Sequence, residues 1–112
     1  GLQDPDHLDH IVRSTWELEV ANRLHRNDIE YEYEGLEINW VDDKIYTPDF
    51  VTEEYVIEVK GNLYGMSEEE KARATMKELD DREYVVVGTE LPCDIHIPWE
   101  ERDSLEELFS SQ

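Results

Sequence analysis

Two carboxylates and one lysine lie close together in a run of strand-forming residues. The stretch YTPDFVTEEYVIEVKG, residues 46–61, contains Asp49, Glu58 and Lys60. If its central EE pair forms a two-residue turn, antiparallel pairing places Asp49 directly opposite Glu58, with Lys60 on the same face. Opposed carboxylates destabilise a sheet when nothing lies between them. A hard divalent cation such as Mg²⁺ would remove that repulsion, and a lysine beside it can help activate water or stabilise charge on a phosphate.

A third acid is predicted on the buried face of a helix. The helix is expected to begin at Ser14, because STWE is a capping box and Glu17, Val20, Ala21 and Leu24 recur at the spacing of one face. Burial of an unpaired carboxylate is costly, so Glu17 needs a cation, a hydrogen-bond partner or a pocket that holds metal or water. The alternative is a glutamate at the edge of the stripe that reaches solvent.

Further elements must position these side chains. Residues 29–40 alternate apolar and acidic residues, which predicts a half-buried strand with a bulge or bend at Gly35, and Asp42-Asp43 could close a hairpin into the next strand. A helix is predicted within 66–81, a strand buried on both faces at 83–88, a short strand at 95–97, and a short C-terminal helix. The helix between two strands favours a β-α-β crossover and hence an α/β fold.

Length and composition predict one small domain. We expect a polar leader at residues 1–13 and a single domain at 14–112. Cys93 is the only cysteine, which excludes an internal disulfide and a thiolate zinc site. The sequence contains no long apolar run and no secretion signal, so we expect a protein without a membrane span, located in the cytoplasm, or in the host cytoplasm if its source is viral.

The charge is strongly acidic. Thirty Asp and Glu residues face ten Lys and Arg residues, for a formal net charge of −20. Such a surface repels a polyanion such as DNA unless ions screen it. At about 1 M salt the Debye length is roughly 3 Å, so a halophilic host explains the acidity. The competing interpretation is a catalytically silent DNA mimic or binding protein, whose carboxylates imitate phosphates.

The motifs resemble those of a known nuclease superfamily. PDF at residues 48–50, followed by EVK at 58–60, is similar to the PD-(D/E)xK signature. The longer series STWELEVANRLHRNDIEYEYE, YTPDF and EVKG, within residues 14–61, resembles the phage endonuclease I family of Holliday junction resolvases. The resemblance implies a restriction-endonuclease-like fold, a mixed β-sheet flanked by helices, and Mg²⁺-dependent hydrolysis of branched DNA, with Mn²⁺ able to substitute. Nicking or repair cleavage is the nearest enzymatic alternative.

The resemblance also assigns roles to individual residues. Asp49 and Glu58 match the carboxylates that bind the metal, and Glu17 matches the helix acid that completes the metal site. Lys60 matches the catalytic lysine, and the backbone carbonyl of Val59 would be a further metal ligand. The predicted catalytic set is therefore Glu17, Asp49, Glu58 and Lys60.

Partners are predicted from the same resemblance and from charge. Symmetrical cuts in a junction need two active sites, so a homodimer is expected. The segment before TPDF is shorter than in these resolvases, whose dimers exchange strands through it, so strand exchange does not follow. Lys71, Arg73 and Lys77 are candidate contacts to DNA phosphates, the alternative being ordinary pairing with neighbouring glutamates on a helix.

Overall fold

The computed structural model describes residues 15–41, 44–61, 67–79 and 81–110. The predicted leader, Ser14 and the predicted hairpin turn at Asp42-Asp43 lie outside the described residues. In chain order the elements are α1 (Thr15–Arg26), β1 (Glu32–Tyr33), β2 (Ile38–Val41), β3 (Lys44–Tyr46), β4 (Phe50–Val51), β5 (Tyr55–Lys60), α2 (Ser67–Glu78), β6 (Glu83–Gly88), β7 (Ile95–Ile97), the 3-10 helix η1 (Trp99–Leu105) and α3 (Glu107–Ser110). None of the described helices is long and apolar enough to cross a membrane.

The main sheet has five strands in the order β1-β4-β5-β6-β7. β1 and β5 each pair with β4 in the antiparallel sense, whereas β6 runs parallel to both β5 and β7. β2 and β3 form a separate antiparallel pair. A parallel neighbour requires a crossover connection, and α2 supplies it between β5 and β6. The predicted α/β fold, a mixed sheet flanked by helices, is confirmed.

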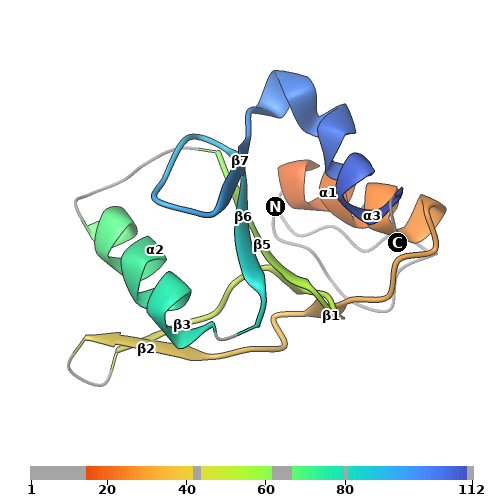
Figure 1. The fold of residues 1–112 in the computed structure, drawn as a ribbon. Helices are drawn as coiled ribbons and strands as arrows, with labels where there is room; N and C mark the ends of the chain where they lie inside the picture. Colours follow the sequence, from red (N-terminus) through yellow and green to blue (C-terminus); the bar gives the residue numbers. More distant parts are fainter. Residues whose placement is uncertain (1–14, 42–43, 62–66, 80, 111–112) are drawn as a thin grey trace.

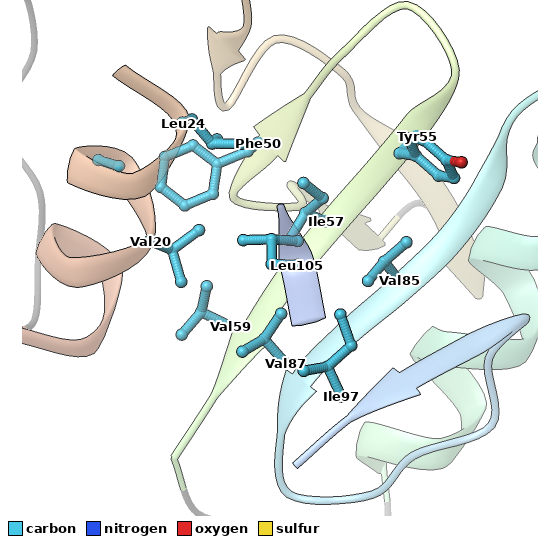
Figure 2. Close-up of a cluster of buried hydrophobic side chains, with 11 residues drawn as sticks. Val20, Leu24, Phe50, Tyr55, Ile57, Val59, Val85, Val87, Ile97 and Leu105 are labelled. Atoms are coloured by element: carbon cyan, nitrogen blue, oxygen red, sulfur yellow. The ribbon is translucent and has the colours of Figure 1, made fainter. Parts of the chain in front are cut away.

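Helices cover both faces of the main sheet (Figure 1). On one face, α1 and the C-terminal helices enclose a core that contains Val20, Phe50, Ile57 and Leu105 (Figure 2). On the other face, α2 packs over a second core. The apolar sequence of β6 follows from this arrangement, because its residues Tyr84–Gly88 are buried in a central strand.

The predicted register of β4 and β5 is confirmed. Phe50 pairs with Ile57 and Val51 with Val56, and the backbone N–H of Thr52 donates to the carbonyl of Tyr55 at 2.8 Å. Side chains therefore alternate between the faces as expected, with Phe50 and Ile57 in one core and Val51 and Val56 in the other. The sheet face that carries Asp49 and Glu58 is covered by α2. It is therefore not open to solvent, although it carries polar residues.

The prediction of one strand over residues 29–40 is wrong. This segment contains two strands in different sheets, β1 and β2, separated by a turn. Glu34 in that turn has a φ of 54°, a left-handed conformation that ends the pairing of β1. The alternating pattern indicated extended backbone correctly, and Gly35, where a bulge or bend was predicted, lies in the segment that separates β1 from β2.

Gly88 lies where β6 ends, paired with Lys60 at the C-terminal end of β5. Its φ is +115°, and a Cβ atom added there would lie 2.2 Å from the carbonyl oxygen of Lys60 and 3.1 Å from Cζ3 of Trp16. Trp16 in turn stacks on Trp99, with ring centroids 4.1 Å apart and parallel planes. Only glycine fits this position without displacing the backbone of β5.

We therefore expect Gly88→Ala to destabilise the fold by roughly 2 to 4 kcal/mol, measured by chemical unfolding. Gly61→Ala is the matched control, because among the described residues a Cβ atom at Gly61 would meet only Trp16, at 3.9 Å or more. Its effect should stay within about 0.5 kcal/mol. Equal stability of the two variants would contradict the close approach at Gly88.

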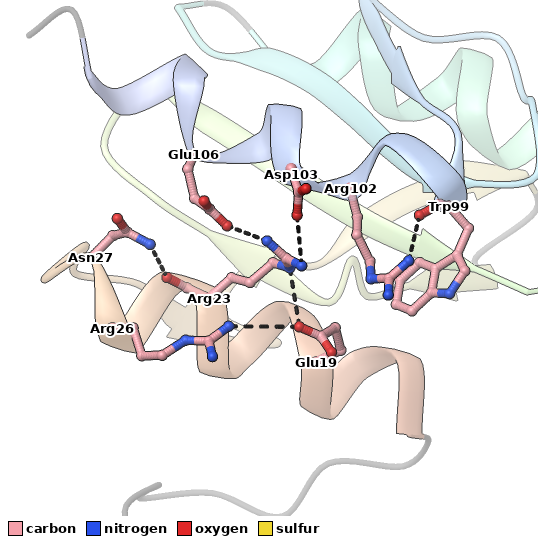
Figure 3. Close-up of polar contacts among 8 residues, drawn as sticks. All are labelled: Glu19, Arg23, Arg26, Asn27, Trp99, Arg102, Asp103 and Glu106. Carbon is pink, nitrogen blue, oxygen red and sulfur yellow. Dashed lines mark hydrogen bonds and ion pairs between the residues drawn. The ribbon is translucent and has the colours of Figure 1, made fainter.

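Arg23 connects α1 to the C-terminal segment (Figure 3). Its guanidinium group forms ion pairs with Asp103 at 2.9 Å, with Glu106, and with Glu19 of its own helix at 3.0 Å. The Arg23 side chain is only 13% exposed, so these pairs are partly shielded from water. They fix α1 against the rest of the domain, and α1 carries Glu17.

The net charge predicts an unusual response to salt. Thirty acids on 112 residues repel one another, and KCl screens that repulsion. We expect the melting temperature in chelator to rise on the order of 10 °C between 0.1 and 3 M KCl. A melting temperature that is flat, or that falls with added KCl, would contradict a halophilic origin of the acidity.

Candidate active site

Glu17 is buried, as its position on the helix stripe predicted. It lies in the first turn of α1 and is 8% exposed, beside the core residues Val20 and Ala21. The hydroxyl of Tyr33 donates a hydrogen bond to Glu17 Oε1 at 2.6 Å. This hydrogen bond offsets part of the free energy that burial of the carboxylate costs. The alternative of a solvent-exposed Glu17 is therefore wrong.

Asp49 lies immediately before β4 and is 4% exposed. Its Oδ2 atom accepts a hydrogen bond from the backbone N–H of Val59 at 2.7 Å. Its own backbone carbonyl accepts a hydrogen bond from the N–H of Glu34 at 2.9 Å. These bonds hold the Asp49 carboxylate against β5 at Glu58 and Val59, where the predicted register placed it.

Glu58 is a buried carboxylate with a raised pKa. It lies in β5, it is 6% exposed, and its Oε1 atom is buried without a hydrogen-bond partner. Burial is the main cause that raises the pKa of Glu58 to about 7, and the charges of Glu17 and Glu68 add to it, while Tyr46 and Lys60 oppose it. A buried carboxylate with a free oxygen and a raised pKa is typical of a functional site.

Two tyrosines beside Glu58 were not predicted. The hydroxyls of Tyr46 and Tyr84 lie 3.2 Å apart. Burial, followed by the charge of Glu58, raises the pKa of both tyrosines, so both remain protonated at neutral pH. Tyr46 directly precedes the TPDF motif and could have been suspected from that position, whereas Tyr84 lies in an apolar strand and gave no signal.

Lys60 lies at the end of β5, and its side chain is 21% exposed. Its Nζ atom forms an ion pair with Oε2 of Glu68, in the first turn of α2, at 2.6 Å. Burial alone would raise the pKa of Glu68, but Lys60 and Lys71 outweigh burial and lower that pKa. Glu68 was not predicted, because a glutamate in the first turn of a helix has an ordinary explanation in the helix dipole.

The three predicted DNA contacts differ in their surroundings. Lys71 lies 3.5 Å from Glu68 and 5.9 Å from the centre of the Tyr46 ring. Its charge is thus engaged with neighbours, as the pairing alternative anticipated. Arg73 and Lys77 are exposed on α2. Phosphate contact by these residues stays a prediction.

The described residues contain no group of three or more His, Cys, Asp or Glu side chains already placed to hold a metal ion. The predicted site needs fewer, because Mg²⁺ commonly binds through one or two carboxylates and keeps several waters. Asp49, immediately before β4, and Glu58, in β5, supply those carboxylates, and among the described residues no donor forms a hydrogen bond to Oε1 of Glu58. The chemistry of these donors therefore fits a hard divalent cation.

A separate cavity of about 600 Å³ lies away from these carboxylates. It is lined by residues 27–32 and 51–54, together with Arg82 and Phe109. None of the four predicted catalytic side chains lines it. The candidate site is thus described by its buried charges, and it is separate from this cavity. Comparison of the chain with protein families, curated proteins and solved structures found no match.

Proposed function

We propose that this protein is a metal-dependent endonuclease that hydrolyses DNA phosphodiester bonds. The observation that carries the proposal is the burial of Glu17, Asp49 and Glu58, with Lys60 two residues after Glu58 in β5. Stability alone gives no reason for three buried acids, since each is costly to desolvate. A divalent cation at Asp49 and Glu58 would reverse the local electrostatics and give the acids a role.

Asp49 and Glu58 would hold the metal, with the carbonyl of Val59 as a further ligand and Glu17 completing the site. When bound, Mg²⁺ lowers the pKa of water and neutralises charge on a phosphate. Asp49 is fixed for this task by the N–H of Val59, and Glu17 by the hydroxyl of Tyr33. Pre-fixed ligands reduce the reorganisation needed during reaction.

Lys60 would act on the phosphate or on the attacking water. Its ammonium group can stabilise negative charge that develops as water adds to phosphorus and the ester P–O bond breaks, leaving a phosphate monoester and an alcohol. The partial exposure of Lys60 matters, because the group must be reached by a substrate that arrives from solvent. Asp49 and Glu58 are more deeply buried than Lys60 and would form the inner part of the site.

The resemblance to junction resolvases supports branched DNA as the substrate and a homodimer as the active form. Because the protein carries a net charge of −20, its affinity for DNA must rely on the bound cation, on screening by salt, and on the few exposed cations such as Arg73 and Lys77. The DNA-mimic alternative is less well supported, because a mimic displays carboxylates on its surface and these three are buried.

A cleavage assay tests the proposal. The purified protein is incubated with Mg²⁺ or Mn²⁺ and a labelled four-way junction at several KCl concentrations, beside a linear duplex and a flap. We expect cleavage that requires the metal and that is strongest on the junction. Absence of cleavage at every salt concentration, or cleavage that persists in chelator, would refute the proposal, whereas preference for the duplex would refute only the choice of substrate.

A further inference from the structure

Glu68 holds Lys60 from outside the predicted catalytic set. Its side chain is 13% exposed, and its two oxygens face two lysines, Lys60 at 2.6 Å and Lys71 at 3.5 Å. Lys71 also lies over the ring of Tyr46, whose hydroxyl neighbours Glu58. Glu68 thus belongs to a polar network that connects α2 to the candidate metal ligands.

Lys60 has two carboxylates within its reach. Glu58 precedes it by two residues on the same face of β5, and the two side chains attract each other electrostatically. The close ion pair of Lys60 is nevertheless with Glu68, and Oε1 of Glu58 has no hydrogen-bond partner. The position of Lys60 therefore decides whether Glu58 is available to a cation.

We propose that Glu68 is a positioning residue that draws the Lys60 ammonium group away from Glu58 and keeps this carboxylate open to the divalent cation. The proposal rests on the metal site of the proposed function. Lysine has a flexible four-carbon stem, so in the absence of Glu68 it turns to the nearest uncompensated charge. Glu58, which is buried and whose Oε1 atom has no hydrogen-bond partner among the described residues, is that charge, and a lysine bound there must be displaced before a metal ion can bind.

The affinity of the full chain for Mn²⁺ measures directly whether Glu68 keeps Glu58 open to a cation. This measurement does not depend on catalysis. Mn²⁺ is titrated into metal-free protein at 1 M KCl and followed by electron paramagnetic resonance; only binding that is lost in Asp49→Asn is counted. We expect Glu68→Gln to weaken this binding about tenfold. This is the lower end of the loss in metal affinity that follows when a residue that orients the metal ligands is removed. Glu69→Gln, an exposed neighbour with the same change in charge, should leave it within about twofold.

A double-mutant cycle separates positioning from simple loss of charge. In a Lys60→Met background the Lys60 ammonium group cannot compete for Glu58, so Glu68→Gln should change Mn²⁺ affinity by less than about twofold. An equal loss in both backgrounds, or no loss in the native background, would overturn the role of Glu68 while leaving the metal site intact. If the native protein shows no binding that depends on Asp49, the metal site and the role of Glu68 both fail.

Discussion

Replacement of Asp49 by asparagine is expected to reduce Mg²⁺-dependent junction cleavage on the order of 10³-fold or more. Asparagine keeps the shape of the side chain and an oxygen that can accept the hydrogen bond from the N–H of Val59. It lacks the negative charge that a hard cation requires. The rate is measured in single-turnover reactions with excess protein, so that a loss of chemistry is not hidden by product release.

Glu53→Gln is the matched control for Asp49→Asn. Glu53 lies in the turn between β4 and β5, it is exposed, and its substitution changes the net charge by the same amount. Its cleavage rate should stay within about twofold of the native rate, since exposed charges on this surface interact weakly. Comparable losses in both variants, or full activity of Asp49→Asn at equal stability, would remove Asp49 from the catalytic set.

Replacement of Glu58 by glutamine is expected to stabilise the metal-free protein by about 3 kcal/mol above pH 7. The pKa of Glu58 is raised from its ordinary 4.5 to about 7 by burial. Between these values the folded state binds more protons at this group than the unfolded state, so stability falls as pH rises. Glutamine is neutral at every pH, so the Glu58→Gln variant does not lose this stability as pH rises.

The prediction is measured by urea unfolding of both proteins between pH 4.5 and 8.5 in chelator. The difference in free energy of unfolding should be small near pH 4.5, grow until about pH 7, and then level off. Added Mg²⁺ should stabilise the native protein and not Glu58→Gln, because a ligand stabilises only the state that binds it. A pH-independent difference would show that Glu58 does not titrate near neutrality.

Local patterns were sufficient to predict the pairing of β4 with β5 and the placement of the acids. Alternation along residues 46–61 gave the pairing of β4 with β5, because a shift by one residue would have exchanged the buried and polar faces. The helix stripe placed Glu17 inward because one acid shared the spacing of three apolar residues. Both predictions depended on contacts close in sequence.

The partners of those acids could not be predicted, because they come from distant parts of the chain. Tyr84 reaches Glu58 across the sheet from β6, and Glu68 reaches Lys60 only after α2 folds over the face. Tyr33 contacts Glu17 from β1, which ends just before the turn at Glu34 that made the prediction for 29–40 wrong. Tertiary packing, which periodicity does not encode, decides these contacts.

The central claim is that Asp49 and Glu58 form a site for one divalent cation at the end of β5. Anomalous diffraction from crystals soaked in Mn²⁺ tests it most directly, with crystals of Asp49→Asn treated in the same way. We predict an anomalous peak between the carboxylates of Asp49 and Glu58 in the native protein and none there in the variant. Native crystals that show Mn²⁺ only at surface acids, with the carboxylates of Asp49 and Glu58 free of metal, would contradict the claim.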